Sequence, residues 1–129
     1  MTVVIDGSAL AIAVVDTGDR GAAALSQLHN GGVAPHLVDA EVGQALRGMV
    51  LRGLLDPAAA ERSLLAAEML VVDRFPHPPL GRRAWALRDN VSFYDGLYVA
   101  LAEAMNVPLL TADARLAKAR GPRCSIALV

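Results

Sequence analysis

The sequence predicts an α/β fold built around a parallel β-sheet. Short apolar runs such as residues 3–5 and 109–111 alternate with longer segments whose apolar residues recur at helical spacing. This alternation is typical of βαβ units, in which helices connect parallel strands. With 129 residues and no linker or low-complexity tract, the chain is expected to form a single domain over residues 1–129.

The first third of the chain is predicted to contain one strand and two helices. The β-branched residues at positions 2–5 predict the strand, and the largely apolar segment at positions 8–15 predicts the helix after it. A turn rich in Gly and Asp covers residues 16–21, and a second helix is expected to extend to about residue 29. The glycines that follow Asn30 end this helix, because Gly favours turns.

The middle of the chain predicts two strands and two helices. A short strand near Val33 leads into a helix over residues 37–52. The dipeptide Asp56-Pro57 starts the next helix, since Asp is a good N-cap and Pro is tolerated at the first helical position. This helix is expected to reach about residue 69, and residues 70–73 are expected to form a strand.

The last third of the chain predicts a central helix and the remaining strands. Prolines at positions 76, 78 and 79 are expected to prevent regular structure before a short helix over residues 81–88. Segment 93–105 is apolar nearly all round, so it is predicted to be a buried helix. The other elements expected here are a strand at residues 109–111, a short helix at 114–118 and a strand at 125–128.

The composition excludes several classes of protein. The apolar content of 54% is high, but no run approaches the roughly 20 apolar residues of a membrane span. The early apolar run lacks the basic region of a signal peptide, and the single Cys124 excludes an intramolecular disulfide and a cysteine-based zinc site. We therefore expect a cytoplasmic protein without membrane association, whose excess apolar surface is buried by self-association or by a partner.

Two carboxylates follow predicted strands. Asp6 comes directly after the first strand, and Asp113 comes two residues after the strand at 109–111. Open α/β sheets bind ligands at the carboxyl ends of their strands, which favours a functional role for both residues. The alternative is that each caps the helix that follows it, although Ser8 could cap the first helix in place of Asp6.

Two further carboxylates lie near the starts of predicted helices. Glu41 falls at the border of the apolar stripe of its helix, whereas Asp39 faces elsewhere. Asp95 lies in the first turn of a helix with almost no polar face, where the helix dipole favours an anion by only about 0.3–1 kcal/mol. Shielding an unpaired carboxylate costs several kcal/mol, so Asp95 needs a cation or a hydrogen-bond network.

Together these acids predict a metal site. Several carboxylates that converge on one pocket need a cation, and carboxylate oxygens suit Mg²⁺ or Mn²⁺. We expect one or two such ions to be held by Asp6, Glu41, Asp95 and Asp113. Candidates for positioning water or phosphate are Ser8, Asn90, Thr111 and Arg115, with strand packing as the alternative for Thr111 and a capping or turn role as the alternative for Asn90.

Four segments of the chain resemble the acidic blocks of PIN-domain ribonucleases, and of VapC toxins in particular. They are residues 3–9, 39–42, 94–103 and 109–116, which contain the four acids in order and at suitable spacing. The family often has Ser or Ala where this chain has Gly7. This departure does not affect any of the four acids.

The resemblance implies a fold and a function. The fold would be a PIN-like three-layer structure, with a five-stranded parallel sheet in the order 3-2-1-4-5 and helices on both faces. The function would be that of an endoribonuclease toxin that cleaves RNA phosphodiesters by metal-activated water, with Asp6, Glu41, Asp95 and Asp113 as catalytic and metal-binding residues. The resemblance further implies a homodimer inhibited by a cognate VapB-like antitoxin.

The RNA-binding groups and two alternative functions remain open at this level. Eleven of the twelve basic residues are arginines, and those considered for RNA contact are Arg47, Arg52, Arg82, Arg83, Arg88 and Arg115. A phosphoaspartate phosphatase or receiver-like domain would also place Asp6 after a first strand, but the former needs an acid at position 8 and the latter a suitably placed lysine. A catalytically inactive PIN-like binding module is the other alternative.

Overall fold

The computed structural model of the chain describes residues 2–129, and its centre is a five-stranded parallel sheet. The strand order is β3-β2-β1-β4-β5, with every neighbouring pair parallel. This order confirms the predicted fold. The topological switch point, on either side of which successive strands are added in opposite directions, lies between β1 and β4. The strands are β1 (Val3–Ile5), β2 (Gly32–Pro35), β3 (Val71–Phe75), β4 (Leu109–Thr111) and β5 (Ile126–Leu128).

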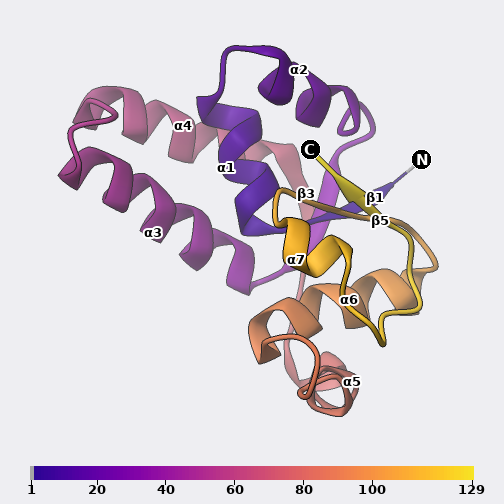
Figure 1. The fold of residues 1–129 in the computed structure, drawn as a ribbon. Helices are drawn as coiled ribbons and strands as arrows, with labels where there is room; N and C mark the ends of the chain where they lie inside the picture. The colour runs from indigo at the N-terminus through magenta and orange to yellow at the C-terminus, as the bar shows by residue number, and fades with distance from the viewer. Residues whose placement is uncertain (1) are drawn as a thin grey trace.

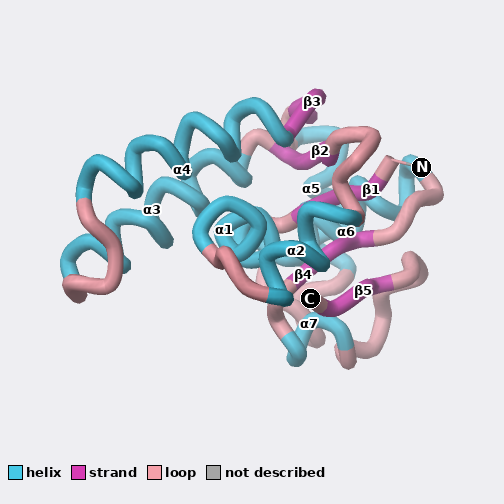
Figure 2. Tube along the Cα trace, turned by 90° about the horizontal axis from the view of Figure 1, so that it is seen from above, coloured by secondary structure: helices cyan, strands magenta, loops and turns pink. Residues whose placement is uncertain are grey.

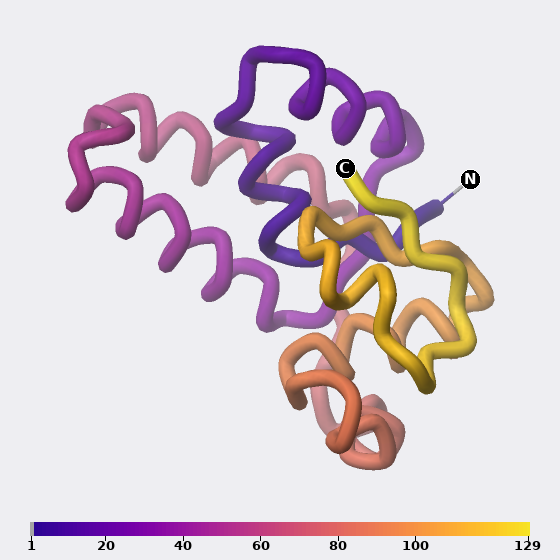
Figure 3. Tube along the Cα trace, in the orientation of Figure 1, coloured from indigo at the N-terminus to yellow at the C-terminus, as the bar shows by residue number. Residues whose placement is uncertain are grey.

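Helices cover both faces of this sheet. They are α1 (Gly7–Val15), α2 (Asp19–Ser26), α3 (Leu37–Leu51), α4 (Pro57–Leu70), α5 (Pro78–Ala86), α6 (Phe93–Met105) and α7 (Ala114–Ala117). In Figure 1, α2 lies above the strands, α1 lies to their left, and α5 and α6 lie below them. Figure 2 shows the strands next to one another, from β3 at one edge of the sheet to β5 at the other. Helices α3 and α4 form a hairpin that extends away from the strands (Figure 3).

Helix α6 is the central helix that its apolar sequence predicts. Every residue from Gly96 to Ala102 is buried. Helix α5 packs closely on α6 at Gly96, where an added Cβ atom would lie 3.0 Å from the Cα atom of Ala84. The loop between α5 and α6 contains Asn90, which lines the same cleft as Asp95 in the first turn of α6.

The start of α5 differs from the sequence-based prediction. We expected prolines 76, 78 and 79 to prevent regular structure until residue 81, but α5 begins at Pro78. The prediction was wrong because the first residues of a helix need no intrahelical N–H donor, so Pro is tolerated there. Strand β3 also ends later than expected, at Phe75, because pairing with β2 continues as far as Pro35.

Large apolar side chains remain exposed on the α3–α4 hairpin. Leu51, Leu54, Leu65 and Met69 are all exposed. Within residues 2–129, no helix is long and apolar enough to span a membrane. Burial of these residues by self-association or by a partner stays a prediction.

Candidate active site

Asp6 lies at the carboxyl end of β1 and is almost fully buried, with 4% of its surface exposed. Its Oδ1 atom accepts hydrogen bonds from the Ala9 amide at 2.9 Å and from the Ser8 hydroxyl at 2.6 Å. Its Oδ2 atom accepts a hydrogen bond from the Thr111 hydroxyl at 2.5 Å. Asp6 is therefore the N-cap of α1, and the idea that Ser8 takes over this role is wrong, because the Ser8 hydroxyl donates to Asp6.

Thr111 connects β1 to the turn that carries Asp113. The Thr111 hydroxyl oxygen accepts a hydrogen bond from the Asp113 amide at 3.0 Å. Asp113 in turn caps α7 by accepting from the Arg115 amide at 2.8 Å, and its Oδ1 atom lies 3.8 Å from the Arg115 guanidinium. Both strand-end acids are therefore helix caps, and the same geometry holds them at the carboxyl edge of the sheet.

Glu41 reaches this edge from α3. The fully buried Tyr98 of α6 donates a hydrogen bond from its hydroxyl to Glu41 Oε1 at 2.5 Å. Gly7 permits this approach, since a Cβ atom at position 7 would lie 2.6 Å from the Cβ of Glu41. The departure from the usual family residue at Gly7 thus has a local structural consequence. Asp39 faces elsewhere, as predicted, and the structure shows that it pairs with Arg74 at 2.6 Å.

Asp95 and Asp113 line the same cleft. The cleft has a volume of about 260 Å³ and is lined by Asn90, Val91, Ser92, Asp95, Asp113, Arg115 and Leu116. Ser92 caps α6 by accepting from the Asp95 amide at 3.1 Å, which leaves the Asp95 carboxylate outside the capping interaction. Four residues predicted from sequence therefore meet here, namely Asn90, Asp95, Asp113 and Arg115.

Burial and repulsion raise the pKa values of three of the four acids. Burial is the main reason that the pKa of Asp6 is raised, and hydrogen bonds from Ser8 and Thr111 only partly offset it. Burial also raises the pKa of Glu41, with added repulsion from Asp6 and Asp95. The pKa of Asp95 is raised by burial and then by repulsion from Asp6 and Asp113. The four carboxylates therefore act on one another as a single negative cluster.

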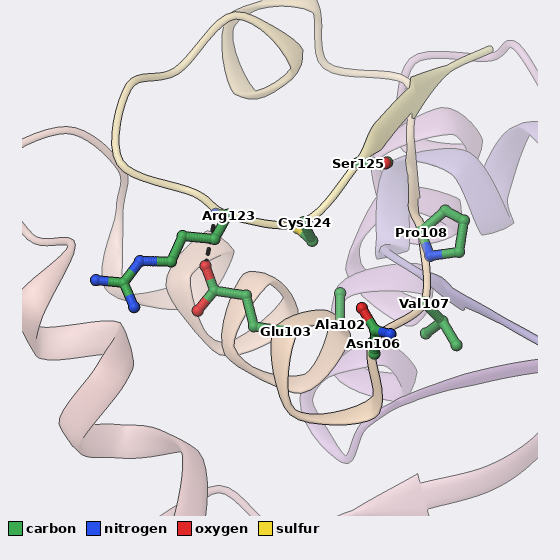
Figure 4. Close-up of a pocket in the computed structure, with 8 residues that line it drawn as sticks. All are labelled: Ala102, Glu103, Asn106, Val107, Pro108, Arg123, Cys124 and Ser125. Carbon is green, nitrogen blue, oxygen red and sulfur yellow. Dashed lines mark hydrogen bonds between the residues drawn. The ribbon is translucent and has the colours of Figure 1, made fainter.

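A larger hollow lies elsewhere, at the amino ends of β4 and β5. Its volume is about 530 Å³, and Figure 4 shows its lining residues, among them Glu103, Asn106, Cys124 and Ser125. The Glu103 carboxylate is already bound there by the Arg123 amide at 2.7 Å and by Arg83. None of the site residues predicted from sequence lines this hollow. The four acids lie at the opposite, carboxyl ends of the strands.

The sequence of the chain matches one known domain family. The PIN domain profile matches residues 3–122. The chain belongs to the PIN domain family.

Relatives of this PIN domain agree with the family assignment. It is 55% identical over 97 residues to Ribonuclease VapC1 of Mycobacterium tuberculosis, covering 74% of this chain and 73% of the relative. Ribonuclease VapC9 of the same species is 41% identical over 128 residues, covering 98% of each chain. Among solved structures, VapBC2 from Rickettsia felis, bound to a DNA fragment from their promoter, has a TM-score of 0.69 at 16% identity and covers 100% of this PIN domain and 99% of that chain.

Sequence reasoning missed one residue of the site and left the arginines unranked. Tyr98 was treated only as part of an apolar helix, although a phenol in such a helix needs a hydrogen-bond partner, and Glu41 is that partner. Arg83 is bound to Glu103 and to the Gly121 carbonyl, so its guanidinium is already engaged away from the cleft. Arg115 alone among the arginines lines the cleft with Asp95 and Asp113.

Proposed function

We propose that this PIN domain is an endoribonuclease that depends on Mg²⁺ or Mn²⁺. The observation that carries the proposal is the convergence of Asp6, Glu41, Asp95 and Asp113 from four elements on the carboxyl edge of the sheet. A cluster of buried carboxylates is stabilised by a divalent cation, whose charge offsets their repulsion. The two mycobacterial relatives are named ribonucleases, which supports RNA as the substrate.

The side chains at the site fit a hydrated, oxygen-preferring cation. Hydrogen bonds among residues 2–129 engage one carboxylate oxygen each of Glu41 and Asp113, and the Ser92 hydroxyl is the hydrogen-bond partner of the Asp95 carboxylate. No three His, Cys, Asp or Glu side chains in that range are arranged to hold one ion directly. This suits Mg²⁺, which usually keeps several waters and takes one or two carboxylates. Of the four acids predicted as ligands, Glu41, Asp95 and Asp113 would hold the ion partly through its bound waters. Asp6 would contribute its negative charge, because both of its carboxylate oxygens accept hydrogen bonds from the protein.

The surrounding residues position these acids and the substrate. Ser8 and Thr111 orient Asp6 through their hydroxyl groups, and Tyr98 orients Glu41. The side chain of Arg115 is 96% exposed at the cleft, where its guanidinium can bind a phosphate oxygen. When bound, the cation supplies stabilisation for charge developing on the phosphate and lowers the pKa of an attacking water. No side chain needs to act as a nucleophile.

Of the alternatives left open by the sequence, the family match removes the phosphatase and the receiver-like domain. The hydrogen bonds at Asp6 agree with this, because both of its carboxylate oxygens already accept from protein donors. A catalytically inactive binding module is the competing function that the experiment below must exclude.

The test is cleavage of total bacterial RNA by the purified chain. We expect cleavage with Mn²⁺ or Mg²⁺ and none in EDTA, with products that carry 5′-phosphate and 3′-hydroxyl ends. Asp95→Asn should abolish cleavage, whereas Asp73→Asn makes the same change at an exposed position on β3 and should leave it intact. Cleavage in EDTA that yields cyclic phosphate ends would contradict the proposal.

We infer further that the chain is the toxin of a two-protein pair that acts in the cytoplasm. It would form a homodimer and be inhibited by a cognate VapB-like antitoxin. Support comes from the VapC names of the relatives and from the apolar side chains exposed on the α3–α4 hairpin. Light scattering of the purified chain should give the mass of a dimer; a soluble monomer at micromolar concentration would argue against the homodimer.

A further inference from the structure

Three of the five aromatic side chains of this PIN domain are exposed, and one of them, Tyr94, directly precedes Asp95. The chain has two Phe, two Tyr and one Trp. Trp85 and Tyr94 are each 61% exposed and Phe93 is 44% exposed, on the consecutive helices α5 and α6. Leaving large rings in water is unfavourable, so such a group typically marks a binding surface.

These rings continue directly from the candidate active site. Tyr94 precedes Asp95 and lies four residues before Tyr98, so it occupies the same face of α6 as the residue that binds Glu41. Phe93 lies over Gly81 of α5, where an added Cβ atom would be 4.0 Å from its ring. Trp85 follows Gly81 by one helical turn. The rings thus lead outward from the acids across α6 and α5.

Positive charge accompanies the rings. The guanidinium of Arg88 lies 5.0 Å from the centre of the Trp85 ring. Arg82 and Arg88 are exposed, and neither forms an ion pair with any residue between 2 and 129, whereas the neighbouring Arg83 is paired with Glu103. The Arg88 guanidinium donates one hydrogen bond to the Trp85 carbonyl at 3.1 Å. Guanidinium groups without a carboxylate partner that alternate with aromatic rings suit a chain of phosphates and bases.

We propose that Trp85, Phe93 and Tyr94 form a stacking surface for unpaired bases that flank the phosphodiester at the acids, with Arg82 and Arg88 binding the phosphates between them. The proposal rests on the proposed endoribonuclease function. Bases stack on protein rings only when they are not already stacked in a helix. The surface therefore favours single-stranded or loop RNA and excludes duplex RNA.

The test uses Trp85, the only tryptophan, as its reporter. In EDTA, a single-stranded RNA dodecamer of mixed sequence should quench Trp85 fluorescence, and the same sequence as a duplex should not. Tyr94→Ala should weaken binding of the single strand about tenfold, which corresponds to the loss of one base–ring stack. Tyr94→Phe keeps the ring and should restore binding. Leu25→Ala truncates an exposed side chain on α2, away from the acids, and should have no effect.

Cleavage kinetics test the stacking proposal and the proposed nuclease function independently. With Mn²⁺, Tyr94→Ala should raise KM and leave kcat nearly unchanged, and Tyr94→Phe should match the wild type. If the wild type cleaves RNA and Tyr94→Ala has unchanged KM and unchanged dodecamer affinity, the stacking surface is wrong and the nuclease stands. If the wild type binds the dodecamer with quenching but cleaves no RNA, the nuclease is wrong. If Tyr94→Ala changes the mass in light scattering but not RNA affinity, the surface is a protein interface and the stacking proposal is overturned.

Discussion

Tyr98 holds Glu41 through the phenol hydroxyl, the only atom that Tyr98→Phe removes. The hydrogen bond lies in a buried environment, so its loss leaves the Glu41 carboxylate with one partner fewer. We expect Tyr98→Phe to lower the free energy of unfolding by about 1–3 kcal/mol at neutral pH. Urea unfolding measures this change. Tyr94→Phe removes an exposed hydroxyl from the same helix and is the matched control; equal effects of the two variants would show that the Glu41 contact is energetically unimportant.

Asp95 is expected to destabilise the metal-free fold. Burial raises the pKa of Asp95, and repulsion from Asp6 and Asp113 raises it further. The carboxylate is therefore less stable in the folded protein than in the unfolded chain, so Asp95→Asn should melt above the wild type in EDTA at pH 7. Saturating Mn²⁺ should reverse the order, because it stabilises the wild type more than the variant.

Six melting curves test this expectation, one with and one without Mn²⁺ for each of the wild type, Asp95→Asn and Asp73→Asn. Asp73→Asn, at an exposed position, should leave the melting temperature nearly unchanged in both conditions. A lower melting temperature of Asp95→Asn both with and without Mn²⁺ would identify Asp95 as a structural acid.

At the scale of secondary-structure elements, the α5–α6 contact depends on a glycine. A Cβ atom at Gly96 would lie 3.0–3.1 Å from the Cα, Cβ and carbonyl oxygen of Ala84. Because these are mostly backbone atoms of a packed helix, Gly96→Ala must push α5 away from α6 and should destabilise the protein by about 1–3 kcal/mol. At Gly48 in α3 no atom lies within 4 Å of the added methyl group, so Gly48→Ala should stabilise by up to about 1 kcal/mol.

Urea unfolding of both glycine variants provides the measurement. Opposite signs for Gly96→Ala and Gly48→Ala are expected from the same chemical change in two helices. A neutral or stabilising Gly96→Ala would mean that α5 can shift freely, and the position of the Asn90 loop would then not depend on this contact.

At the scale of the whole molecule, the acid cluster makes stability depend on pH and metal. The pKa values of Asp6, Glu41 and Asp95 are raised in the folded state, chiefly by burial. The folded protein therefore binds protons at these three acids more tightly than the unfolded chain does, and proton binding stabilises the fold. This stabilisation is fully present below the unfolded pKa values of about 4, and it is lost as the pH rises through the raised pKa values of the folded state. The pKa of Glu103 is lowered instead, because hydrogen bonds from Arg83 and the Arg123 amide outweigh its burial, and it acts in the opposite direction.

Metal addition should therefore have a pH-dependent effect on melting. Saturating Mn²⁺ should raise the melting temperature more at pH 7.5 than at pH 5, because protonated carboxyl groups do not bind the ion. Differential scanning fluorimetry with and without EDTA measures this difference. The Asp95→Asn variant should show a smaller increase at pH 7.5, and an equal increase in both proteins would place the bound ion elsewhere.

The local pattern of residues determined most of the elements and the positions of the acids along the chain. Alternation of apolar runs indicated the parallel α/β class, and the buried helix of residues 93–105 is observed as α6 with the same bounds. Local pattern also placed Asp6 and Asp113 after strands and Asp95 in a first helical turn, because these positions depend only on near neighbours. The strand order was implied by resemblance to a family, since periodicity does not specify which strands pair.

Only the tertiary structure decided how these residues contact one another. Ser8 and Thr111 meet across 103 positions of sequence, Thr111 and Asp6 across 105, and Tyr98 and Glu41 across 57. The ion pair of Arg83 with Glu103 and the contact of Phe93 with Gly81 also follow from the packing of α5 on α6. Helical and strand periodicity define which face a residue occupies, but a contact between two distant faces depends on how the helices and the sheet pack together.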